Sequence, residues 1–146
     1  MSNYYTLGLN FLHSDSSACL FRNNVLLAAS EEERFTRIKH TSNFPVNSIN
    51  YCLQQANINI SDIDLVTINT NPFSGIIKKF FFVITHLSAI KIVVFSLINA
   101  RKKITLSKLL SKIDNQKQFR GKIKFVDHHE AHIASSLLFS KFSKCV

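Results

Sequence analysis

The sequence predicts an α/β fold that opens with a β-meander and continues as helix, strand and helix. Short runs of apolar and β-branched residues come first, at 4–10, 17–22 and 25–30. An amphipathic helical pattern follows over 44–58, and from residue 122 the chain reads strand then helix. Strands followed by alternating helices and strands are typical of a sheet covered by helices.

The turns support this order. Asn23 and Asn24 join the second and third runs, and paired asparagines tolerate the positive φ of a tight hairpin turn. The stretch EEERFTRIKH (31–40) begins with carboxylates, which favour the positive end of a helix, so a short helical turn is expected there.

The remaining elements follow from periodicity. One face of 44–58 carries the apolar residues Val46, Ile49, Cys52, Leu53 and Ala56. The chain then predicts a strand at 65–69, one or two helices within 76–113, a strand at 122–126 and a helix at 128–139.

Length indicates one domain or a piece of a larger one, and the last helix returns to no strand, so 1–146 is interpreted as the front part of a larger domain. The composition includes 46% apolar residues and a formal net charge of +9. The basic block 101–124 lacks interleaved aromatics and keeps Leu and Ile at helical spacing, so we expect a solvated helix face and no nucleic-acid partner. Three distant cysteines without a CxxC pair indicate neither a zinc knuckle nor a disulfide framework, and a cytoplasmic location is expected.

The run 80–100 is apolar enough to suggest a membrane span. Lys91 lies at its centre, and a central lysine costs about 2.5–3.5 kcal/mol on insertion. We therefore favour a buried or partner-covered helix over a membrane helix.

Three histidines lie at the start of the last predicted helix. His128 and His132 are four residues apart and share one face, so their imidazoles can converge on one metal ion at the carboxyl end of strand 122–126. His129 points about a quarter-turn away and is expected to serve a substrate. The alternative is a polar helix start that faces solvent, and a metal would need carboxylates from elsewhere.

Two further stretches could carry chemistry. In LHSDSSACL (12–20), His13 beside Asp15 could act as a general base, and the loop N–H groups and serines could hold phosphate. In EEERFTRIKH, Arg34 and Lys39 could bind phosphate or carboxylate. The alternatives are an ordinary polar turn and a solvated charged turn.

Taken together and in order, four stretches carry a resemblance: LGLNFLHSDSSACLF, AASEEERFTRIKHTSNFP, INYCLQQANI and VDHHEAHIASSLLFSKF. They resemble the amino-terminal part of the carbamoyltransferase family, which includes the nodulation-factor and antibiotic O-carbamoyltransferases. The similarity runs from about residue 4 to residue 142, and it is strongest over 7–58 and 122–142.

The resemblance implies a partial actin/hexokinase-like ATPase fold of the ribonuclease H-like type. It also implies ATP-dependent O-carbamoylation, in which carbamoyl phosphate and ATP give carbamoyl-adenylate in a separate carboxyl-terminal domain. The amino-terminal domain, to which this sequence belongs by resemblance, would then pass the carbamoyl group to a hydroxyl of a small-molecule acceptor, in secondary-metabolite or glycan biosynthesis.

The resemblance also implies roles for residues. His128 and His132 match the family's metal ligands for a divalent ion of the iron(II) type, completed by later aspartates. His13 and Asp15 match the catalytic pair, although Ser14 separates them here and the two are adjacent in many members. Two other site residues, Arg34 and Lys39, match a charged stretch near the nucleotide or acceptor.

Family members are several times longer than this sequence. We therefore expect the later metal carboxylates and the adenylate-forming domain to be absent from 1–146, and the chain alone to be inactive. Three origins stay open: a fragment, a truncated gene product, and one half of a split enzyme whose partner would be a separately encoded carboxyl-terminal half. The alternatives are a catalytically inactive remnant, a partner subunit of a split enzyme, and a small basic membrane protein anchored by 80–100.

Overall fold

The computed structural model describes residues 2–11, 14–69, 106–111, 113, 118–138 and 140. It has an α/β fold around a five-stranded sheet in the order β3-β2-β1-β4-β5. The strands are β1 (Tyr5–Asn10), β2 (Ser17–Arg22), β3 (Val25–Glu31), β4 (Leu65–Ile68) and β5 (Lys122–Phe125). The helices are α1 (Glu33–Thr36), α2 (Val46–Ala56), the 3₁₀ turn η1 (Ile60–Asp62), α5 (Leu106–Ser111) and α6 (His128–Leu138).

The strand directions identify the type of sheet. β2 pairs antiparallel with both β1 and β3, whereas β4 is parallel to β1 and β5 is parallel to β4. Only β2 therefore runs against the other strands of the described sheet. This order and direction are those of a ribonuclease H-like domain, the unit from which actin/hexokinase-like ATPases are built, so the predicted fold class is confirmed.

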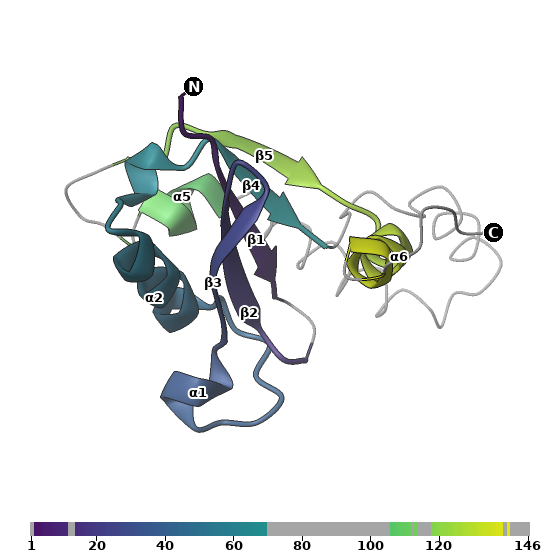
Figure 1. Cartoon of the computed structure of the whole chain (residues 1–146). Helices are drawn as coiled ribbons and strands as arrows, with labels where there is room; N and C mark the ends of the chain where they lie inside the picture. The colour runs from purple at the N-terminus through teal and green to yellow at the C-terminus, as the bar shows by residue number, and fades with distance from the viewer. Residues whose placement is uncertain are drawn as a thin grey trace, which may run out of the picture.

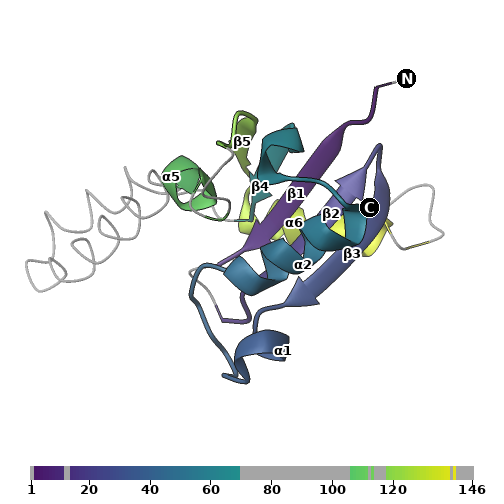
Figure 2. The ribbon, with the colours of Figure 1, turned by 90° about the vertical axis from the view of Figure 1, so that its left-hand side faces the viewer.

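Helices cover the sheet from two sides. Figure 1 shows α2 and α5 on one side of the sheet and α6 on the other, and the turned view in Figure 2 agrees. The core lies between the sheet and the first pair of helices. Its fully buried members include Leu7, Leu20, Ile49, Cys52, Val66, Ile68, Leu106 and Leu110.

The two-residue period of β1 sorts its side chains between the faces. Leu7, Leu9 and Phe11 are buried in the core, and Gly8 and Asn10 point to the opposite face. The sheet therefore has one apolar face under α2 and one face built from small and polar residues.

The predicted elements agree with the described ones. Asn23 and Asn24 form the hairpin turn with φ of 48° and 69°, and the acidic stretch forms the four-residue helix α1. Of the predicted helical region 76–113, α5 lies within the described residues. The apolar run 80–100 lies outside them.

β5 reaches its place beside β4 through a close backbone approach. A Cβ at Gly121 would lie 2.3 Å from the carbonyl oxygen of Ile63, so only glycine fits. Lys122 N–H then donates to the carbonyl of Asp64, and Val126 N–H donates to that of Ile68, both at 2.8 Å. This register brings the start of α6 to the carboxyl edge of β4.

Candidate functional site

The carboxyl ends of β1, β4 and β5 meet at one edge of the sheet because these strands are parallel. Asn10 ends β1, Asn69 follows β4, and Asp127 follows β5. Open α/β sheets place ligands at such an edge. The residues that the sequence singled out on 12–20 and 128–132 follow these strand ends.

α6 begins with a cap and then presents the histidine pair. The Asp127 carboxylate accepts the His129 N–H at 2.9 Å, which satisfies a free donor of the first turn. One turn of helix stacks His128 and His132, whose Nε2 atoms are 3.1 Å apart. Their rings are nearly perpendicular, at 88°, with centroids 4.5 Å apart. The helix thus brings the two Nε2 atoms within hydrogen-bonding distance of each other, and the exposed His129 ring lies beside that of His128.

The separation of the two nitrogens fits ligation of a single ion. Nitrogens held about 2.0–2.1 Å from a metal lie roughly 3.0 Å apart at a right angle and roughly 3.4 Å apart at the tetrahedral angle. The observed 3.1 Å falls within that range. Among the described residues, no group of three or more His, Cys, Asp or Glu could hold a metal. The pair therefore fits part of a metal centre, and further ligands must come from other residues.

Asp15 has a partner that sequence reasoning did not identify. Its Oδ1 lies 3.0 Å from Nδ1 of His40, the last residue of the charged stretch 31–40. His13, the partner predicted from the sequence, lies outside the described residues. The spacing of 25 residues gives no local signal for the contact between Asp15 and His40.

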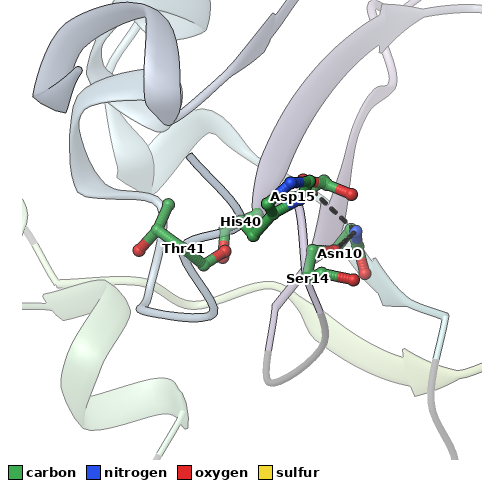
Figure 3. A network of polar contacts seen from close by, with 6 residues as sticks. Asn10, Ser14, Asp15, His40 and Thr41 are labelled. Atoms are coloured by element: carbon green, nitrogen blue, oxygen red, sulfur yellow. Dashed lines mark hydrogen bonds and ion pairs between the residues drawn. The ribbon is translucent and has the colours of Figure 1, made fainter. Parts of the chain in front are cut away.

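Polar contacts fix the loop that carries Asp15 (Figure 3). Asn10 Nδ2 donates to the carbonyl of Asp15 at 2.9 Å and to that of Ser14 at 3.4 Å. Asn69 Nδ2 donates to Asn10 Oδ1 at 3.0 Å, which joins the end of β4 to the same network. These contacts tie Ser14 and Asp15 to the ends of β1 and β4.

A second tie fixes the segment that carries His40. The Ser16 N–H and hydroxyl both donate to the carbonyl of Thr41, at 3.0 and 2.9 Å. Ser16 is fully buried, so these bonds are shielded from water. The hairpin loop and the turn before α2 are therefore held together at the residues that flank the Asp15–His40 pair.

Glu32 is a buried carboxylate that the sequence did not single out. It is 3% exposed and accepts four hydrogen bonds, from the backbone N–H and side chain of Asn47 and of Ser48. These donors belong to the first turn of α2, where backbone N–H groups have no acceptor within the helix itself. The Glu32 N–H donates in turn to the carbonyl of Ser16 at 2.8 Å. Glu32 thus connects α2 to the loop network.

A cleft of about 940 Å³ lies over the small, polar face of the sheet. Gly8 and Cys19 form part of its floor, and Ala131 and Ser135 of α6 line it as well. A Cβ at Gly8 would lie 2.7 Å from the Cys19 sulfur, so a larger residue there would have to displace that thiol. The pattern of small residues at alternate strand positions was the available sequence signal for this cleft.

The two charged residues predicted to bind substrate are placed differently. Arg34, on α1, lines the cleft together with Glu31. Lys39 is exposed in the turn between α1 and α2 and is not among the described residues that line the cleft.

Burial keeps both described thiols protonated. It raises the pKa of Cys19 above the ordinary value, partly offset by a hydrogen bond from the backbone of Gly8. Burial also raises the pKa of Cys52 to about 12, with a smaller contribution from Cys19. Neither thiol is therefore poised as a nucleophile near neutral pH.

Comparison with known proteins identifies the family. The model for the carbamoyltransferase N-terminus matches residues 5–145, nearly the whole chain. This chain belongs to the carbamoyltransferase N-terminus family. The resemblance predicted from the sequence motifs is thereby confirmed, and so is membership of a transferase family.

Individual relatives agree with this assignment. The nodulation protein NolNO of Sinorhizobium fredii is 33% identical over 144 residues, which cover 97% of this chain and 20% of NolNO. The protein sll1178 of Synechocystis is 30% identical over 147 residues, or 96% of this chain and 24% of that protein. The carbamoyltransferase N-terminus chain described here thus spans about a fifth to a quarter of their length.

Among solved structures, YeaZ from Pseudomonas aeruginosa is similar with a TM-score of 0.44 and 13% identity. The match covers 85% of this chain and 43% of YeaZ. The fold assignment of this carbamoyltransferase N-terminus rests on its strand order. None of the helices in the described part of the chain is long and apolar enough to cross a membrane.

Proposed function

We propose that this chain forms part of the transfer site of an ATP-dependent O-carbamoyltransferase. In the proposed reaction, ATP and carbamoyl phosphate give carbamoyl-adenylate, and the carbamoyl group then passes to a hydroxyl of a small-molecule acceptor. The observation that carries the proposal is the convergence of His128 and His132 at 3.1 Å, at the sheet edge where the loop of Asp15 also begins, in a member of this family.

The histidine pair is proposed to hold a divalent metal of the iron(II) type, with carboxylates supplied from outside the described residues. When bound, such an ion supplies Lewis-acid polarisation of a carbamoyl or phosphate oxygen. Nε2 of both His128 and His132 must carry no proton to bind the ion, because a protonated nitrogen has no free lone pair. His129, one residue along the helix, is proposed to contact the substrate.

The loop and the charged stretch have complementary roles in this proposal. Asp15 orients an imidazole that takes the proton of the acceptor hydroxyl, and the sequence assigns this imidazole to His13. Arg34 lines the cleft, where its guanidinium could pair with a phosphate group of the nucleotide. The Lys39 ammonium group, in the exposed turn, could attract the same negatively charged substrate. The substrates ATP and carbamoyl phosphate favour the cytoplasm as the location.

The proposal is tested on the native polypeptide that carries this sequence, expressed with the product of the gene directly downstream. ATP and labelled carbamoyl phosphate are added with a panel of hydroxyl acceptors, including a chitin tetrasaccharide and an aminoglycoside. We expect pyrophosphate release and a labelled acceptor. Pyrophosphate release without any labelled acceptor would favour a partner or remnant role. The absence of both pyrophosphate and labelled acceptor would contradict the proposal.

A further inference from the structure

His40 is the imidazole that the described structure places on Asp15, with Nδ1 3.0 Å from Oδ1. We propose that His40, oriented by Asp15, takes the proton from the acceptor hydroxyl during carbamoyl transfer. This inference rests on the proposed function and deepens it, since it assigns the proton acceptor to a residue of the turn before α2 rather than to His13.

The contact with Asp15 selects one tautomer of the imidazole. A carboxylate only accepts hydrogen bonds, so Nδ1 of His40 must carry the proton that it donates to Oδ1. In the neutral ring Nε2 then carries the lone pair, which is the form a general base needs. Asp15 also stabilises the imidazolium that forms when Nε2 takes up a proton. The geometry therefore provides an oriented base and its orienting carboxylate.

Both members of the pair have left-handed backbone conformations. Asp15 has φ of 67° and His40 has φ of 54°. Such conformations are uncommon outside glycine and persist where neighbouring contacts fix them. Here the fixing contacts flank the pair: Asn10 donates to the Asp15 carbonyl, and Ser16 donates twice to that of Thr41. Two loops distant in sequence are thus held so that these two side chains meet.

The exposure of Asp15 and His40 argues for a chemical role of the pair, since its contribution to folding stability is small. The side chain of His40 is 76% exposed and that of Asp15 is 51% exposed. An ion pair so exposed to water adds little to folding stability. The same exposure leaves the imidazole accessible to small molecules from solvent.

The transfer step balances with the reactants of the proposed function. The acceptor O–H bond breaks, and its proton moves to Nε2 of His40. The acceptor oxygen forms a bond to the carbamoyl carbon of the mixed carbamic–phosphoric anhydride. The bond from that carbon to the phosphate oxygen breaks, and the nucleotide phosphate leaves with the electron pair. His40 then returns the proton to solvent.

The test substitutes the two histidines and the aspartate in the native polypeptide. His40→Asn tolerates the left-handed backbone and keeps an N–H donor for Asp15, yet has no basic nitrogen. His13→Asn is the rival variant. Asn24→Ala is the control, since it disturbs another left-handed position, with φ of 69°, at the opposite end of β2. Each variant is assayed for pyrophosphate release and for label in an acceptor that the wild type carbamoylates.

We expect His40→Asn to slow transfer by about 10²–10⁴-fold, the range for loss of a general base, with pyrophosphate release unchanged. Asn24→Ala should transfer like the wild type. Transfer by His40→Asn at the wild-type rate would overturn the inference and leave the proposed function intact. A wild type that labels no acceptor would overturn the proposed function and the inference with it.

Nitrogen NMR of the histidine side chains gives a readout that needs no acceptor. In the wild type, His40 should be protonated at Nδ1 when neutral, and Asp15→Asn should shift it toward the Nε2–H form. Transfer by Asp15→Asn should fall while its pyrophosphate release persists. A neutral His40 already protonated at Nε2 in the wild type would contradict the orienting role of Asp15.

Discussion

The imidazole rings of His128 and His132 stand almost at right angles, with their Nε2 atoms 3.1 Å apart. We predict that His128→Ala or His132→Ala weakens binding of iron(II) by more than about 100-fold, because loss of a direct ligand should exceed the effect of losing an outer-shell partner. Metal content of the purified native polypeptide, measured by mass spectrometry, checks this. His129→Ala is the matched control and should retain the metal. Equal metal content in all three variants would contradict the assignment.

Glu32 accepts four hydrogen bonds from the first turn of α2 while it is 3% exposed. Glu32→Ala should therefore lower the free energy of unfolding by about 2–3 kcal/mol, since buried donors lose a charged acceptor. Urea unfolding followed by circular dichroism measures the change. Glu33→Ala, at the partly exposed neighbouring position, should stay within about 0.5 kcal/mol of the wild type. A similar loss in both variants would show that the hydrogen bonds accepted by Glu32 make no specific contribution to stability.

Gly8 lies directly under the sulfur of Cys19, where a new Cβ would come within 2.7 Å. Gly8→Ala should cost about 1–3 kcal/mol of stability through overpacking at the floor of the cleft. Cys19→Ala removes the clashing sulfur, so the double variant should recover much of that loss. Additive losses in the double-mutant cycle would show that the two positions do not interact.

The raised pKa of the Cys52 thiol predicts that the protein loses stability at alkaline pH. The thiol has a model value of 9.0, and in the folded chain burial raises its pKa to about 12. Between these values the unfolded chain releases a proton that the folded chain keeps. The contribution of the protonated Cys52 thiol to the free energy of unfolding is thus complete below pH 9.0. It declines as pH rises toward about 12, by about 1.4 kcal/mol per pH unit.

Cys52→Ala isolates this effect. At about pH 8 the variant should be less stable by about 1 kcal/mol, because it leaves a small cavity under α2. At about pH 10.5 the gap should close or reverse, since only the wild type has lost the contribution of the protonated thiol. Urea unfolding at both pH values measures the gap. A gap that does not change with pH would contradict burial of the thiol.

Features that depend on local geometry could be predicted from the sequence alone. The four-residue spacing of His128 and His132 stacks them on any α-helix, and the two-residue period of β1 separates Leu7 and Leu9 from Gly8. Asn23 and Asn24 likewise predicted their turn from backbone preferences alone. In each case the relevant neighbours are within a few residues, so the period of the backbone is sufficient to place them.

Contacts between distant segments became visible in the folded structure and could not be predicted from the sequence. Asp15 meets His40 across 25 residues, and Glu32 reaches Ser48 across 16. The cleft over Gly8 also needs several strands and α6 to be in place. These contacts depend on which strands pair and on which side each helix packs. That choice is made by burial of the whole apolar face of the sheet, and no short stretch of sequence encodes it.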